Sequence, residues 1–150
     1  MGELVYLSIK NGIRHIDCAC DYGNEREVGL GIKRALDERI CDRSSLWITS
    51  KLWNTYHAKE HVEMACRKSL EDLALDYFDL YLIHFPISQK FVPFDVRYPP
   101  EWIHDPTSAN PCIIQENIPI SETWEGMEGL VGLKLVKNIG VCNMTVSLKF

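Results

Sequence analysis

The 150-residue sequence predicts an α/β fold in which short buried strands alternate with amphipathic helices. Apolar residues recur at three- and four-residue steps in the longer segments, as on one face of a helix. Short runs of bulky or β-branched residues lie between those segments, as in strands. The order reads helix, strand, helix, strand, helix, strand, long loop, helix, strand. Such alternation is typical of parallel βα units.

The first predicted helix covers residues 2–11, and a short strand over 13–17 follows it. The apolar residues of this helix lie near helical spacing: Leu4, Leu7 and Ile9. The pair Asn11-Gly12 is a typical helix stop. The CACDYG segment after the strand is predicted to be a loop, with Gly23 as its turn residue.

The second predicted helix begins after Asn24, a residue type that is favoured as a helix N-cap. Glu25 and Glu27 in its first turn suit the positive end of the helix. One apolar stripe follows, made of Val28, Ile32, Ala35 and Leu36. The next strand lies within 46–54, where Leu46 to Thr49 are strand formers bounded by polar residues.

A third helix is predicted at about 58–74, followed by a strand of almost unbroken bulk at 78–84. The helix has one face of small and apolar residues: Val62, Ala65, Cys66, Ser69, Leu70 and Leu73. Residues 85–120 hold all seven prolines and form a long loop, which is functional or a mere insertion.

Ser121 is the expected N-cap of the last complete helix. The apolar stripe of that helix consists of Trp124, Met127, Leu130 and Val131. A final strand is predicted at 136–142. The last six residues, TVSLKF, begin a further helix.

Composition limits the classes of function. The chain is 46% hydrophobic and 25% charged, which is typical of a globular protein, and its net charge is −5. This charge argues against a nucleic-acid surface, and no apolar run approaches the roughly 20 residues of a membrane span. The six cysteines form no CxxC pair, and no secretory signal is visible, so we expect free thiols and a cytoplasmic location.

Two architectures fit the alternating order: a doubly wound open sheet and a (β/α) barrel. A dinucleotide-binding open sheet should carry GxGxxG directly after a strand. The glycines of this chain do not supply that motif, because most lie inside predicted helices: Gly29, Gly31, Gly126, Gly129 and Gly132. The open sheet is therefore the weaker alternative.

Polar side chains stand at equivalent positions, where the predicted strands end. Asp17, Lys51 and His84 are each about one βα unit apart, and Asn143 follows the fourth strand. A lysine at the mouth of a buried strand is costly unless an anion or a reaction uses it. Tyr22 lies in the loop after Asp17. Each residue alone has a structural explanation, but together they predict one cavity that holds an acid, a phenol, an amine and an imidazole.

Several stretches resemble the aldo-keto reductase family, and most closely its aldose and xylose reductase branch. They are GIRHIDCACDYGNEREVG, LWITSKLWNTYH, LEDLALDYFDLYLIHFP and KNIGVCN, and HFPISQKFVPFDVRYPP is particularly similar to xylose reductases. The resemblance implies a partial (β/α)8 TIM barrel of about four parallel strands with flanking helices. Residues 1–150 would form one partial domain that lacks the family's first strand and its C-terminal half. We therefore expect a truncated product, an alternative transcript or an incomplete gene model.

The same resemblance implies a catalytic tetrad of Asp17, Tyr22, Lys51 and His84. The activity would be NADPH-dependent reduction of aldehyde or ketone carbonyls, with NADH as a further possible cofactor. Tyr22 would be the general acid, because a neighbouring ammonium group favours the ionised form of a phenol. Asp17 would orient Lys51 and lie near the cofactor, and His84 would orient the substrate carbonyl.

Further contacts are implied for the substrate and the cofactor. Trp53 and Phe85 would form apolar walls beside the substrate, with residues 85–120 as a long substrate-side loop. Alternatively, the two aromatic residues belong only to the core. Asn143 would bind the nicotinamide carboxamide next to Cys142, where family members commonly have serine.

The expected partner is a small carbonyl substrate, with no nucleic acid and no membrane. No metal site is expected, since His57 and His61 lack both the HExxH pattern and a third ligand. A four-stranded parallel sheet has two bare edges, which favours self-association. The alternative function is therefore that of a truncated, non-catalytic fragment that acts only by association with another chain.

Overall fold

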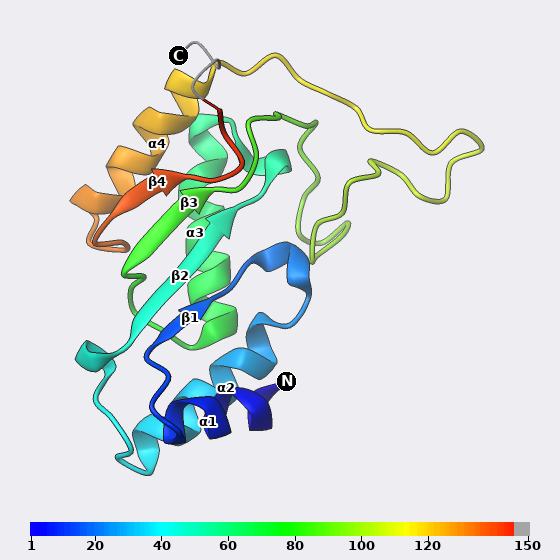
Figure 1. The fold of residues 1–150 in the computed structure, drawn as a ribbon. Helices are drawn as coiled ribbons and strands as arrows, with labels where there is room; N and C mark the ends of the chain where they lie inside the picture. Colours follow the sequence, from blue (N-terminus) through cyan, green and yellow to red (C-terminus); the bar gives the residue numbers. More distant parts are fainter. Residues whose placement is uncertain (146–150) are drawn as a thin grey trace.

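The computed structural model describes residues 1–145, and within them four parallel strands form one sheet in the order β1-β2-β3-β4 (Figure 1). The strands are β1 (His15–Asp17), β2 (Trp47–Leu52), β3 (Leu80–Ile83) and β4 (Ile139–Val141). Spatial order follows chain order, because each helix returns the chain to the start of the next parallel strand. The predicted α/β class and the parallel arrangement are confirmed.

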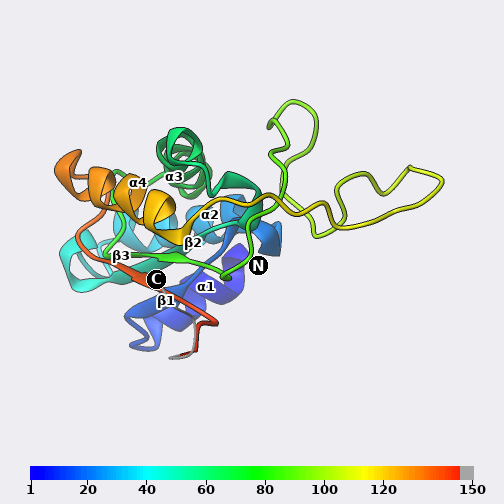
Figure 2. The ribbon, with the colours of Figure 1, turned by 90° about the horizontal axis from the view of Figure 1, so that it is seen from above.

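Four α-helices connect or precede the strands within the described part. They are α1 (Gly2–Lys10), α2 (Glu25–Asp37), α3 (Lys59–Leu73) and α4 (Ile120–Gly132). Helices α2, α3 and α4 follow one another along one face of the sheet, and α1 packs against α2 (Figure 2). Short 3₁₀ turns lie at η1 (Cys20–Tyr22), η2 (Arg43–Ser45) and η3 (Asn54–Tyr56). None of these helices is long and apolar enough to cross a membrane.

The register of the strands decides which side chains share a face of the sheet. Asp17 pairs with Thr49, which pairs with Leu80, while Lys51 pairs with Leu82. Residues in register in a parallel sheet point to the same side, so these side chains all face away from the helices. The acid of β1 and the lysine of β2 are thus brought to one face by pairing alone.

Predicted boundaries shift where strands and helices meet loops. The strands predicted at 13–17, 78–84 and 136–142 are shorter in the structure. Phe78 and Val136, which precede β3 and β4, still form an isolated parallel bridge. Lys51 lies within β2 and not just past its end. The helix predicted to begin at Thr145 falls largely outside the described residues.

Of the three apolar residues predicted for α1, Ile9 is buried, but Leu4 and Leu7 are not. Leu4 and Leu7 are 63% and 42% exposed, whereas Tyr6 and Ile9 are buried. The reason is the close packing of α1 on α2, in which the backbone of Gly2 approaches that of Gly31 and turns Tyr6 and Ile9 toward the core. Near-helical spacing alone does not determine which side meets a neighbouring helix.

Helix α4 begins two residues earlier than predicted. Its N-cap is Pro119, so Ser121 lies inside the first turn and is not the cap. Proline already has the φ value suited to a helix start, which favours the earlier beginning. Within the predicted stripe, Met127 and Leu130 are buried, but Val131 is 41% exposed. Helix α3, in contrast, buries all six residues predicted for its inner face.

Candidate active site

Lys51 is the centre of a hydrogen-bonded group at the carboxyl end of β1 and β2. Its ammonium Nζ donates to Oδ2 of Asp17 at 2.7 Å, to the carbonyl oxygen of Cys18 at 2.9 Å and to the hydroxyl of Tyr22 at 3.2 Å. Lys51 is only 4% exposed, so these three acceptors replace the water that a surface lysine would have. The position of Tyr22 follows from η1, the turn after β1 that contacts β2.

The surroundings of Lys51 keep its side chain charged. Burial alone would lower the pKa of its amine, but the hydrogen bonds to Asp17 and Tyr22 outweigh burial and raise that pKa. Tyr22 itself is 49% exposed. The site therefore combines a buried, permanently charged amine with a phenol that a small molecule can reach.

His84 follows β3 and lies on the other side of Tyr22. The two rings are edge to face, with centroids 6.2 Å apart. The imidazole Nδ1 lies 3.3 Å from Oδ1 of Asp21, so the residue before Tyr22 brings a second carboxylate to the site. The sequence analysis missed Asp21, and its place next to Tyr22 in the CACDYG loop is the one signal that could have pointed to it.

The aromatic residues predicted beside the substrate pack on His84 and on one another. Trp53 lies 5.5 Å from the ring of His84 and 5.9 Å from that of Phe85. Trp53 is fully buried, and Trp102 of the long segment covers it edge to face, with ring centroids 4.9 Å apart. In this arrangement Phe85 and Trp102 are the more accessible walls. Trp102 was missed because it lies in an irregular segment, where no periodicity indicates which side chains pack on others.

The residues predicted to contact the cofactor follow β4. Asn143 has a left-handed backbone with φ of 55°, which asparagine tolerates better than most residues. Its amide Nδ2 donates to the carbonyl oxygen of His84 at 2.8 Å and lies 3.4 Å from Sγ of Cys142. The carboxyl end of β4 is thereby joined to the same site as His84.

Comparisons with known proteins identify the family. The Aldo/keto reductase family profile matches residues 3–148. The chain belongs to the aldo/keto reductase family. An NAD(P)H-dependent D-xylose reductase from Pachysolen tannophilus is 56% identical over 146 residues, which are 97% of this chain and 45% of that protein. The corresponding Candida tenuis protein is 49% identical over 147 residues, or 98% of this chain and 45% of that protein.

Solved aldo-keto reductase structures share the fold. The aldose reductase from Schistosoma japonicum superposes with a TM-score of 0.82 at 41% identity, covering 93% of this chain and 44% of that one. The Bombyx mori aldo-keto reductase in complex with NADP gives a TM-score of 0.77 at 41% identity, covering 93% of this chain and 39% of that one. This aldo-keto reductase chain is therefore a partial (β/α)8 barrel that spans less than half the length of these relatives.

The histidines considered for a metal do not meet in the aldo-keto reductase chain. His57 is fully buried, with Nδ1 3.1 Å from the hydroxyl of Ser88, and His61 stacks on Phe91. Between Met1 and Thr145 no group of three metal-binding side chains comes together.

All six cysteines are free thiols, and burial raises the pKa of Cys18 and Cys66 to about 12, which makes these two thiols unreactive.

Proposed function

We propose that this chain carries the catalytic residues of an NADPH-dependent oxidoreductase that reduces aldehyde or ketone carbonyls, of the aldose type, to alcohols. The observation that supports the proposal most is the pair of hydrogen bonds that join Lys51 to Tyr22 and Asp17. They put a charged amine beside a phenol that faces the open side of the sheet. NADH is the alternative cofactor, since the xylose reductase relatives are NAD(P)H-dependent enzymes.

In the proposed reaction the bound nicotinamide supplies the hydride. The alkoxide that forms on the substrate needs a proton, and the half-exposed hydroxyl of Tyr22 gives it. The ammonium of Lys51 then lies next to the phenolate that remains, and Asp17 holds the amine in place. His84, edge-on to Tyr22, hydrogen-bonds the carbonyl oxygen and orients it.

The residues at the end of β4 fit the carboxamide of a nicotinamide. Asn143 carries an amide, the group that pairs best with another amide, and its bond to His84 keeps it beside the tetrad. Cys142 and the half-exposed carboxylate of Asp17 complete the side chains that would hold the ring. We infer that these side chains, at the carboxyl ends of β1 and β4, would hold the nicotinamide.

Titration of the purified chain with NADPH tests the cofactor part of this proposal. We expect a saturable fall in nucleotide fluorescence, because the nicotinamide would lie against ordered side chains. An Asn143→Ala variant should weaken the signal, whereas an Ile113→Ala variant in the long segment should leave it unchanged. No change in fluorescence at high protein concentration would favour a chain that acts without a cofactor.

Replacing Cys142 with serine is expected to tighten nicotinamide binding. A hydroxyl is a stronger hydrogen-bond partner than a thiol, and the Cys142 sulfur already lies 3.4 Å from the amide of Asn143. A gain of one neutral hydrogen bond predicts a roughly 2- to 10-fold lower Kd for NADPH. Isothermal titration of both proteins measures it, and an unchanged or higher Kd would contradict the prediction.

A second candidate function is association with another chain without catalysis. It is favoured by the edge strands β1 and β4, each of which pairs on one side only within residues 1–145, and by Trp47, which is 41% exposed on the face away from the helices. Sedimentation at several concentrations distinguishes a monomer from a self-associating chain. For either function we propose a cytoplasmic location.

A further inference from the structure

We propose that Glu25 is a positioning residue that holds the Tyr22 turn and the Lys51 strand in their relative place. Its role in a reaction rests on the proposed function, but the contacts that define it do not. Glu25 lies three residues after Tyr22, in the first turn of α2, and its side chain passes behind the sheet to reach β2. It touches neither the tetrad nor the open face.

The key contact lies directly behind Lys51. Ser50 is the preceding residue, and because side chains alternate along a strand, it points to the helix side while Lys51 points to the site. The hydroxyl of Ser50 donates to Oε1 of Glu25 at 2.7 Å, and both residues are buried. The bond therefore fixes β2 at the point from which the catalytic lysine projects.

The residues before Tyr22 are attached to β2 at Lys51. The thiol of Cys20 lies 3.8 Å from the carbonyl oxygen of Lys51, and the amine of Lys51 donates to the carbonyl oxygen of Cys18. Residues 18–25 are thus held to residues 50–51 at four points, since the hydroxyl of Tyr22 also accepts from the Lys51 amine. Among these contacts, only the bond from Ser50 to Glu25 involves a residue of α2, so it controls how far the α2 end of this turn closes on β2.

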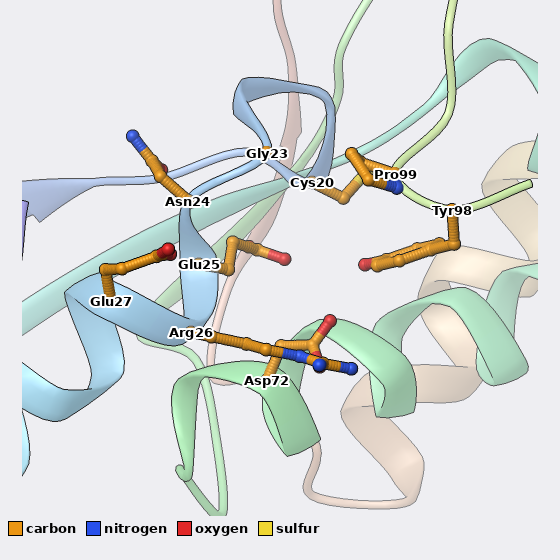
Figure 3. A pocket seen from close by; sticks show the side chains of 9 residues that line it. All are labelled: Cys20, Gly23, Asn24, Glu25, Arg26, Glu27, Asp72, Tyr98 and Pro99. Atoms are coloured by element: carbon orange, nitrogen blue, oxygen red, sulfur yellow. The ribbon is translucent and has the colours of Figure 1, made fainter.

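Glu25 is costly to bury, which argues that its place is not incidental. It is 4% exposed, and burial raises the pKa of its carboxyl to about 7, although the hydrogen bond from Ser50 favours the charged form. Its second oxygen has no hydrogen-bond partner in the described chain. The carboxyl points toward Tyr98 across a cavity of about 230 Å³ (Figure 3). An acid used only for the positive end of a helix could remain in solvent.

The test uses the purified 150-residue chain and two readouts that need no activity. Competitive acylation with mass spectrometry measures how often the Lys51 amine becomes accessible. Carbon NMR of ζ-¹³C tyrosine follows the Tyr22 signal, which a Tyr22→Phe sample identifies. In Glu25→Ala and Ser50→Ala we expect Lys51 to react roughly 10- to 100-fold faster, because one buried hydrogen bond to a charged group no longer opposes local opening. The Tyr22 signal should shift in both variants.

Two controls separate positioning from a general loss of stability. Glu25→Gln keeps an oxygen for the Ser50 hydroxyl and should restore Lys51 protection and the Tyr22 signal. Thr123→Val removes a buried hydrogen bond from α4 to the carbonyl of His57, which involves no residue of 18–25 or 50–51, and should alter neither readout. The proposal is overturned if Thr123→Val exposes Lys51 as much as Ser50→Ala does, or if both Glu25→Ala and Ser50→Ala leave Lys51 protected. Neither result bears on NADPH binding, which tests the proposed function separately.

Discussion

Replacing Tyr22 with phenylalanine is expected to lower carbonyl reduction by about 100- to 10,000-fold, the usual contribution of a positioned general acid. Phenylalanine keeps the ring that faces His84 and removes only the hydroxyl that accepts from Lys51. The alkoxide would then have to take its proton from water. The rate is best measured as NADPH oxidation with xylose, in a chimera where this chain replaces the matching segment of the Pachysolen tannophilus relative.

Tyr6→Phe provides a matched control for that change. The hydroxyl of Tyr6 donates to Glu38 at 2.6 Å where α1 meets α2, far from the tetrad, so its loss removes one hydrogen bond of the same type. We expect the Tyr6 variant to keep near-normal kcat. If the Tyr22 variant also kept near-normal kcat with full cofactor binding, Tyr22 would not be the proton donor.

Sequence spacing predicted which side chains meet at the carboxyl ends of the strands, because parallel pairing imposes that arrangement. Asp17, Lys51 and His84 recur at one βα unit, and pairing in register brings the ends of successive strands to one edge. Helix α3 was likewise predictable, since a helix covered along one side shows a single continuous face.

The features that the sequence did not reveal depend on contacts between distant segments. Glu25 was predicted only to suit the positive end of a helix, yet its carboxyl is buried against Ser50 of β2. Trp102 covers Trp53 from an irregular segment, and the inner side of α1 is set by packing on α2. The local sequence pattern predicts a helix or strand, but it does not identify the segment that will pack on it.

Replacing Asp79 with alanine is expected to destabilise the fold by about 3 kcal/mol, the cost of removing one partner from a buried charged cluster. Asp79 is 3% exposed at the start of β3. It accepts from Arg43 at 2.8 Å, from Lys137 at 2.9 Å and from the backbone N–H of Ile48 at 3.0 Å. One carboxylate thus joins β2, β3 and the segment before β4, and alanine would leave a buried N–H and a half-buried guanidinium without an acceptor.

The same cluster predicts a direction for the pH dependence of stability. Burial alone would raise the pKa of Asp79, but the hydrogen bonds from Ile48, Lys137 and Arg43 outweigh it and hold that pKa below its usual value. A carboxyl with a lowered pKa in the folded state contributes stability above its unfolded pKa and loses it as the pH falls through the folded one. Urea unfolding at neutral and acidic pH should therefore show a difference in unfolding free energy between wild type and Asp79→Ala that shrinks in acid.

Asp37→Ala, which removes an exposed ion pair with Lys33, should cost less than about 1 kcal/mol at either pH. If Asp79→Ala were as mild as Asp37→Ala, the cluster would not hold these strands together.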